Sequence, residues 1–488
     1  MFIAILNKEL KALLLSPRFA ATFAAASILV LLSVEIGIRE YQNAVRQTDT
    51  ARRLSEERLS QQSGWMGASV EAFRTADPLQ VFVTGVSNDV GRFSSVDATD
   101  PVKLQNSAYG DDPVFALFRS IDFAFIVTAV LSLFAILFSY DSVNGEREQG
   151  TLQLTFANPV PRVQFILAKF AGAWLGLIVP LTIPVLIAAL LVMVQGVPMT
   201  GPDWVRFAML LGLSLLFFTC FLVFGILVSA LTRRSNVAFL ICLAGWILLV
   251  LVLPRAAMMA AGLSIPVPSV AEVEGQRDAF AKGQWEEYMK AAGERWRQRQ
   301  EPQQGMSDPE RDVYRDAHIQ GWMDEEDGER KTMQARIEAE GRRLEEDLRN
   351  RKNAQEGLGY ALAMISPASA YQLAAMTLAG TDPGLKTRYE NAIQDYRTLF
   401  NAYVEKRQKE TGGSGGMRIT FDSNKGFSFS APRERGTIDV SGVPRFSPPV
   451  RPTGELILAV MPHAGMLAAI TLFALAGSLA AFLRYDVR

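Results

Sequence analysis

The feature that most constrains this 488-residue chain is a series of apolar stretches, each long enough to cross a bilayer as a helix. A hydrocarbon core of about 30 Å requires about 20 consecutive apolar residues in an α-helix. Six stretches satisfy this requirement, and they are 19–38, 121–140, 167–194, 205–231, 237–263 and 455–483. The sequence therefore predicts an all-α polytopic membrane protein with six transmembrane helices.

Composition supports a division into lipid-facing and water-facing parts. The chain is 49% hydrophobic, yet its mean hydropathy is only +0.14, because the long segments 39–120 and 264–454 are polar. Its 49 Lys and Arg residues balance 50 Asp and Glu residues, so net charge gives no reason to expect nucleic-acid binding. The two polar segments are predicted to be large inserts between transmembrane helices.

The distribution of basic residues predicts how the chain is oriented. Cytoplasmic loops carry an excess of Lys and Arg near the ends of spans. Here these residues gather in segment 1–18, connection 141–166, turn 232–236 and the C-terminus, as Lys8, Lys11, Arg18, Arg147, Arg162, Arg233, Arg234, Arg484 and Arg488. Both termini are therefore predicted to be cytoplasmic and both inserts extracytoplasmic. A cleaved signal peptide is the less favoured interpretation of 19–38, because no small-residue cleavage site follows it.

Residues 1–18 have the pattern of a helix that lies on the inner membrane face. Leu6, Leu10 and Leu13 share one face, while Lys8 and Lys11 lie on the other. Pro17 follows, and it is expected to end this helix.

The inserts are predicted to be mainly helical with minor β content. In 264–454, apolar residues recur at helical spacing in three stripes, each interpreted as a packing core: Trp285, Met289, Ala292 and Trp296; Met333, Ile337, Leu344 and Leu348; and Ile393, Tyr396, Phe400 and Tyr403. Short strands are expected within 77–104 and after 417, and 412–416 is expected to be a flexible linker. Segment 358–380 is mildly apolar but is broken at Ser366-Pro367, so it is predicted to be interfacial or re-entrant and not a seventh span.

Motifs for chemistry on this chain are absent from the sequence. It contains no phosphate-binding G-x-x-x-x-G-K-[ST] loop, no H-E-x-x-H motif and no G-x-S-x-G motif. Its two histidines are far apart, and Cys220 and Cys242 both fall within predicted spans. We therefore expect no catalytic residue, cofactor, metal or disulfide, and we expect a chain that is not itself an enzyme.

The most informative segment is the predicted cytoplasmic connection 141–166. A charged Glu146-Arg147-Glu148 run leads through Gly150-Thr151-Leu152 into a short amphipathic stretch that prolines stop. This pattern favours a short helix that lies parallel to the membrane and faces the cytosol. An ordinary polar connector is the alternative interpretation.

This segment resembles the coupling segment of ABC-2-type permeases, the membrane subunits of ATP-binding-cassette transporters. The matching pattern is E-x-E-x-G-T-L…P…R, and segment 1–18 resembles the N-terminal interface helix of the same family, in a subgroup with an enlarged external domain. The resemblance implies ATPase-coupling residues Glu146, Arg147, Glu148, Gly150, Thr151, Leu152, Pro159 and Arg162, and interface-helix residues Lys8, Glu9 and Lys11.

The resemblance also implies partners and a location. These are two copies of a cytosolic ATPase that binds ATP and Mg, a second permease chain of the same or another kind, membrane lipid and an extracytoplasmic protein. The expected location is the inner membrane of a bacterium. Pro180, Pro184 and Pro462 lie inside predicted spans, where loss of backbone hydrogen bonds makes them gating candidates. A receptor or scaffold, or a mechanotransmitting complex that moves external proteins, remains an alternative.

Overall fold

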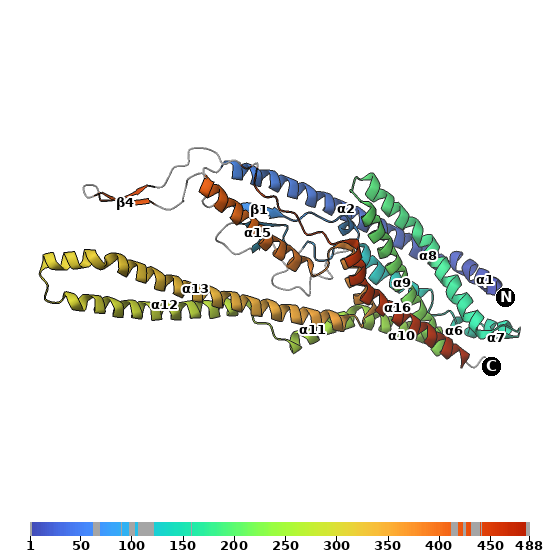
Figure 1. Ribbon diagram of the computed structural model, residues 1–488. Helices are drawn as coiled ribbons and strands as arrows, with labels where there is room; N and C mark the ends of the chain where they lie inside the picture. The colour runs from blue at the N-terminus through green and yellow to red at the C-terminus, as the bar shows by residue number, and fades with distance from the viewer. Residues whose placement is uncertain are drawn as a thin grey trace. The chain divides into compact units, whose positions relative to one another are not determined.

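The computed structural model describes residues 2–61, 69–88, 90–96, 103–105, 122–157, 159–410, 418–422, 426–430, 440 and 442–484 (Figure 1). It forms two compact units. The larger unit combines Met1–Pro254 with Met364–Arg488, and the hairpin unit is Arg255–Ala363. The predicted linker 412–416 and Arg488 lie outside the described residues.

Five helices in the described part of the chain are long and apolar enough to cross a membrane. They are α2 (Pro17–Ser60), α8 (Arg162–Val194), α9 (Gly201–Leu231), the continuous run α10 (Ser235–Trp246), η4 (Ile247–Val252) and α11 (Leu253–Ser264), and α16 (Thr453–Leu483). The remaining predicted span, 121–140, corresponds to a shorter apolar helix, Phe123–Leu137, built from α4 (Phe123–Phe125), η3 (Ile126–Leu131) and α5 (Ser132–Leu137).

The first predicted span continues far beyond its expected end. Helix α2 has 44 residues, so that the first part of the insert 39–120 extends the same helix. The remaining described elements of this insert are β1 (Val70–Phe73), η1 (Pro78–Val81), β2 (Phe93–Val96) and β3 (Lys103–Gln105), which form an antiparallel sheet in the order β1-β2-β3. The β1–β2 register pairs Val70 with Val96 and Phe73 with Phe93.

The second insert contributes helices to both units. The hairpin unit contains α12 (Val270–Gln300), η5 (Glu301–Gln303) and α13 (Asp308–Ala363), in which the two long helices lie side by side (Figure 1). The larger unit contains α14 (Pro367–Ala379), α15 (Leu385–Glu410) and the hairpin of β4 (Arg418–Asp422) with β5 (Gly426–Ser430).

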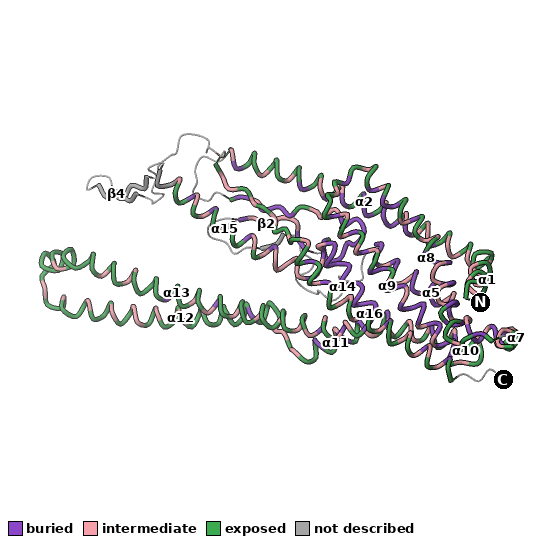
Figure 2. The backbone as a smooth tube through the Cα atoms, turned by 45° about the vertical axis from the view of Figure 1, so that its right-hand side comes forward, coloured by how far each residue is buried: buried purple, intermediate pink, exposed green. Residues whose placement is uncertain are grey.

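Helix α14 forms the centre of the larger unit. All 13 of its residues are buried, as the purple segment labelled α14 in Figure 2 shows, and it packs against α9 and α16. Its N-cap Ser366 donates a hydrogen bond to the carbonyl of Leu249 in the π-helical η4. A helix of this length is too short to span a bilayer, which supports the prediction that 358–380 is not a seventh span.

The three apolar stripes of the second insert have different outcomes. Ile393 and Phe400 are fully buried against the β1–β2 sheet, which confirms that stripe as core. In the hairpin unit Met333 is buried and Ile337 is half-buried, as expected for a face that meets α12. The prediction that the α12 stripe is a packing core is wrong. Helix α12 meets α13 through the neighbouring face, and its stripe is exposed at Trp285 (45%), Met289 (62%) and Trp296 (56%).

The packing of α2 on η1 generates a stability prediction. A Cβ atom added to Gly37 would lie 2.1 Å from the backbone oxygen of Val81. Gly37→Ala should therefore force the two elements apart and lower the free energy of unfolding by about 1–3 kcal/mol. The control is Gly212→Ala in α9, which has open space around it and should not destabilise the helix. Equal thermal unfolding of both variants in detergent would contradict the close contact.

Candidate functional site

The predicted coupling residues lie together at one end of the larger unit. Here α1 (Phe2–Leu14), α6 (Asn144–Glu148) and α7 (Thr151–Phe156) meet the start of α8, the α9–α10 turn and the end of α16 (Figure 1). We call this group of elements the coupling cluster. Connection 141–166 therefore contains two short helices where the sequence predicted one.

The Gly150-Thr151-Leu152 sequence makes the turn between α6 and α7. Gly150 has φ +72°, a left-handed conformation that favours glycine. The hydroxyl of Thr151 donates to the carbonyl of Glu146 at 3.2 Å, and Leu152 is 1% exposed. Each residue thus has a local role: Gly150 allows the turn, Thr151 joins the two helices, and Leu152 anchors α7.

An apolar cluster packs α7 against α8, α9 and α16. Leu152 packs with Val143, Phe165 and Ile226 in one buried group. The ring centroid of Phe165 lies 5.3 Å from that of Phe156 in α7 and 5.3 Å from that of Phe482 in α16. Movement of α7 therefore has to move α8 and α16 or break this packing.

Arg162 joins the beginning of α8 to the end of α16. Its guanidinium donates to the carbonyl oxygen of Leu483 at 2.7 Å. This oxygen belongs to the last turn of α16, where carbonyls lack helical partners and a basic side chain is favourable. Pro159, in the connection that precedes α8, is exposed.

An ion network ties α1, α6 and α8 together. The Oε1 atom of Glu146 lies 2.8 Å from Nζ of Lys8 and 2.9 Å from Nζ of Lys169, and Lys169 also contacts Oε1 of Glu9 at 2.8 Å. The Lys169 side chain is only 3% exposed, so its charge is neutralised inside the protein. Gly172 permits this approach, because a Cβ there would lie 2.7 Å from Cβ of Glu9.

The two lysines favour the charged form of Glu146. Burial alone would raise the pKa of Glu146, but the charges and hydrogen bonds of Lys169 and Lys8 outweigh it and lower the pKa below its usual value. Of the other predicted residues, Lys11 is exposed and Arg147 is half-buried.

A second link, made of hydrogen bonds without ion pairs, connects the region of α6 to α9 and α10. The hydroxyl oxygen of Ser229 accepts hydrogen bonds from the backbone N–H groups of Val143 and Asn144, and Asn144 Nδ2 donates to Thr232 Oγ1 at 3.0 Å. The carboxylate of Glu148 accepts from the backbone N–H of Ser235 at 2.9 Å and from its hydroxyl at 2.8 Å. These bonds lower the pKa of Glu148 and place its negative charge at the N-terminus of α10.

The sequence did not identify several of these residues. Asn144 and Ser229 are buried polar side chains whose importance depends on pairing between distant segments. Leu154 could have been identified, because an apolar residue on the polar face of a short helix is a local signal; it is 72% exposed.

Pro180 and Pro184 lie inside α8, and Pro462 lies inside α16; their gating role stays a prediction.

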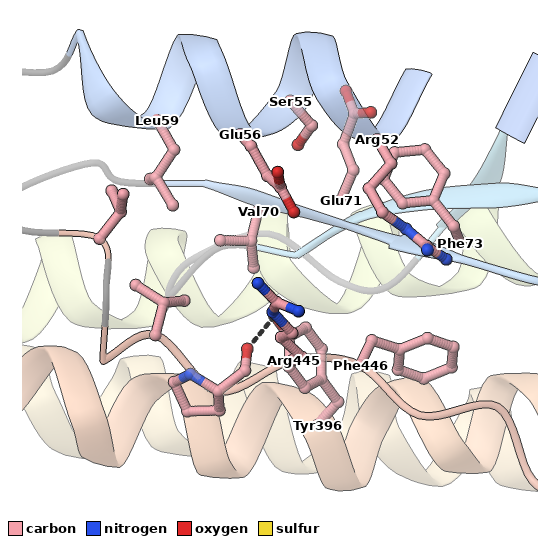
Figure 3. A pocket seen from close by; sticks show the side chains of 13 residues that line it. Arg52, Ser55, Glu56, Leu59, Val70, Glu71, Phe73, Tyr396, Arg445 and Phe446 are labelled. Carbon is pink, nitrogen blue, oxygen red and sulfur yellow. Dashed lines mark hydrogen bonds between the residues drawn. The ribbon is translucent and has the colours of Figure 1, made fainter. Parts of the chain in front are cut away.

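A cavity of about 340 Å³ lies elsewhere in the larger unit, between the C-terminal part of α2, β1 and α15 (Figure 3). Arg52 and Glu56 come from α2, and Tyr396 comes from α15, with its hydroxyl donating to the carbonyl of Pro444 at 2.9 Å. Two arginines and two glutamates among its lining residues balance in charge, so the cavity indicates no particular ligand. Within the described residues, no group of three or more His, Cys, Asp or Glu side chains could hold a metal.

The long apolar helices and the helical content define a multi-pass membrane protein. The sequence model of the ABC-2 family transporter proteins matches residues 3–487, and the chain therefore belongs to this family. It is also similar to the probable ABC transporter permease protein NosY of Stutzerimonas stutzeri, with 34% identity over 131 residues. That match covers 26% of this chain and 47% of the relative. The resemblance drawn from the coupling segment is confirmed, and it places the chain among membrane subunits that are typically not themselves catalytic.

The ion network generates a prediction for stability. Glu146→Gln removes the charge that Lys8 and Lys169 share, and it should lower the free energy of unfolding by about 1–3 kcal/mol at pH 7. Because the pKa of Glu146 is lowered on folding, its contribution is present above the unfolded pKa and is lost as pH falls through the folded pKa. The variant should therefore converge with the unmodified protein in acid.

The measurement is thermal unfolding of the purified protein in detergent across a pH series. Glu148→Gln is the matched control, since its carboxylate is exposed and contacts no lysine in the network. It should have the smaller effect at neutral pH. A Glu146→Gln variant as stable as the unmodified protein at pH 7 would show that the network is not stabilising.

Proposed function

We propose that this chain is the permease subunit that converts ATP hydrolysis on a separate cytosolic ATPase into movement of membrane helices. The observation that carries this proposal is the position of Glu146, whose carboxylate on the short helix α6 contacts both α1 and α8. A force on α6 and α7 is thereby applied to several helices at once.

The surface of α7 supplies the contact for the ATPase in this proposal. Leu154 is 72% exposed, and Gln153 beside it is exposed as well. An isolated apolar side chain surrounded by polar residues suits insertion into a groove of a partner protein. On the inner side of the helix, Leu152 carries the force to the apolar cluster of α8, α9 and α16.

The energy source lies on the partner chains. Two copies of the ATPase bind ATP and Mg, and phosphoryl transfer there drives their closure. Two permease chains, identical or different, form the membrane part, in contact with lipid. The kinks expected at Pro180, Pro184 and Pro462 provide points where the helices bend as substrate is exported or translocated.

The proposed topology places both termini and the coupling cluster in the cytoplasm of a bacterium, with the inserts in the periplasm. Its support is the concentration of basic residues in 1–18, 141–166 and 232–236, near the ends of apolar helices. The connection 195–203 on the opposite side contains neither Lys nor Arg.

A second candidate function is mechanotransmission to an external protein without passage of a substrate through the bilayer. The observation that favours it is in the hairpin unit, where α12 and α13 have 31 and 56 residues and Trp285, Met289 and Trp296 are exposed on one face. Tryptophan is enriched at the energetic centres of protein interfaces. Recovery of a periplasmic protein that depends on both tryptophans would favour this function.

Reversal of charge in the coupling cluster should separate ATP hydrolysis from movement. The double variant Glu146→Lys and Glu148→Lys replaces attraction to Lys8 and Lys169 with repulsion, while α7 keeps its exposed surface. We expect the co-purified ATPase to hydrolyse ATP, but ATP should no longer change the maleimide labelling of a cysteine at position 455, near the start of α16.

The control is the double variant Glu286→Lys and Glu287→Lys on the exposed surface of α12, which should keep the ATP-dependent change. Unchanged ATP dependence in the Glu146 and Glu148 variant would show that the force is transmitted elsewhere. A preparation that hydrolyses ATP without a partner chain would contradict the proposed division of labour.

Cysteine accessibility tests the topology. Cysteines introduced at Lys290 and Glu340 should react with a membrane-impermeant maleimide added outside cells whose outer membrane is permeabilised. A cysteine at Gln153 should react only after the inner membrane is disrupted. Native Cys220 and Cys242 are buried and should give little background. If the cysteine at Gln153 reacted from outside and those at Lys290 and Glu340 did not, the proposed orientation in the membrane would be wrong.

A further inference from the structure

A cavity of about 460 Å³ lies in the larger unit beside the first turns of α9 and α16. Thr200 and Asp203 line it from α9, and Pro452 and Thr453 line it from α16. Arginines and the ring of Tyr389 make up much of the remaining wall. This volume is within the range of small-molecule sites. Nothing in the coupling proposal uses this cavity.

Three of the four arginines that line the cavity are neutralised by aspartates. Arg206 lies 2.9 Å from Asp77 and also pairs with Asp203. Arg388 pairs with Asp382, and Arg451 lies 3.7 Å from the same carboxylate. These groups form ion pairs within the wall and leave little net charge.

Arg74 differs from the other three. It is 7% exposed, and its terminal nitrogens donate to the hydroxyl of Ser87 at 3.2 Å, to the carbonyl of Ser87 at 2.6 Å and to that of Val90 at 3.5 Å. Its Nε atom is buried and has no hydrogen-bond partner among the residues that the structure describes. Every acceptor that Arg74 has in the described structure is uncharged, so a buried positive charge remains without a counter-charge.

An unpaired buried charge is costly, and such groups are concentrated at functional sites. Burial and the nearby charge of Arg92 lower the pKa of Arg74 to about 10, so it remains protonated at neutral pH. The cavity wall therefore carries an excess positive charge. An anion in the cavity would supply the charge that the protein lacks.

The beginning of α16 adds to the positive potential. Pro452 is its N-cap and provides no side-chain hydrogen bond, whereas α9 begins with a complete capping box between Thr200 and Asp203. The N–H groups of Glu455 and Leu456 bond to the carbonyl of Pro452, whereas those of Thr453 and Gly454 have no acceptor in the described part of the chain, and the positive end of the helix dipole lies at the cavity. Such helix ends favour anions.

We propose that this cavity binds a small oxyanion, a carboxylate or phosphate group, between Arg74 and the first turn of α16. Arg74 provides the counter-charge, the N–H groups of Thr453 and Gly454 provide donors, and Tyr389 provides an apolar wall for the body of the ligand. The oxyanion belongs either to a free solute or to a lipid headgroup, and both sources present the same chemistry. The proposal goes beyond ATPase coupling and requires no partner chain.

The test measures binding to the purified full-length protein in detergent. Succinate and inorganic phosphate are titrated at constant ionic strength, with chloride as the reference, by calorimetry and thermal unfolding. A parallel arm follows retention of phosphatidylglycerol by native mass spectrometry. Binding of succinate or phosphate identifies a solute source, and binding of the lipid alone identifies a headgroup source. Absence of binding in all three arms overturns the proposal.

Substitution of Arg74 tests its assigned role. Arg74→Met removes the charge with little change in length and should weaken binding about tenfold or more, because a charged hydrogen bond is lost. Arg351→Gln is the control: Arg351 is an exposed arginine of α13 that pairs with Asp347 and does not line this cavity, so its loss should leave binding unchanged. Equal weakening in both variants, or unchanged binding in Arg74→Met, overturns the proposal.

A second variant keeps the test decisive if Arg74→Met does not fold. Thr75 is exposed and lines the same cavity, so Thr75→Trp fills the space without removing any hydrogen bond of Arg74. It should unfold at the same temperature as the unmodified protein without ligand, and it should lose at least tenfold in affinity. Binding that Thr75→Trp leaves unchanged would place the anion outside the cavity.

Discussion

Lys169 carries a positive charge into the interior of the protein, seven residues after Arg162 in the largely apolar helix α8. A charge in such a position is stable only with partners at hydrogen-bond distance. Glu9 and Glu146 supply them, and each belongs to a different short helix. The attachment of α1 and α6 to α8 thus follows from the need to neutralise one side chain. The remaining contacts of the coupling cluster build on that attachment.

The architecture of the cluster is a series of links that differ in chemistry. Ion pairs hold α1, apolar packing around Leu152 holds α7, and backbone hydrogen bonds to the hydroxyl oxygen of Ser229 hold the start of α6. Ion pairs weaken with salt and acid, whereas apolar packing responds mainly to volume. These links therefore respond to different conditions, and the cluster does not depend on a single kind of interaction.

The sequence was sufficient for features that depend on local pattern. The apolar stretches predicted the long helices, and the Gly150-Thr151-Leu152 motif identified the segment on which the cluster is built, although the sequence predicted one short helix there and not two. The pairing of Glu146 with Lys169 could not be predicted, because it depends on how two segments 23 positions apart fold back on each other. The stripe of Trp285 and Trp296 shows a related limit: periodicity identifies a face of a helix but not the neighbour that covers it.

Helix α2 is continuous over 44 residues, which corresponds to a length of about 66 Å. Near its middle, Gly37 contacts the backbone of Val81 so closely that no side chain fits between them. A rigid tilt of α2 would therefore pivot at this contact. The arm from Gly37 to Ser60 is about 35 Å long, so a tilt of about 10° would displace its outer end by about 6 Å. A displacement of less than one helical turn at the N-terminal end of α2 would thus move its C-terminal end far enough to reshape the surface that α2 shares with β1.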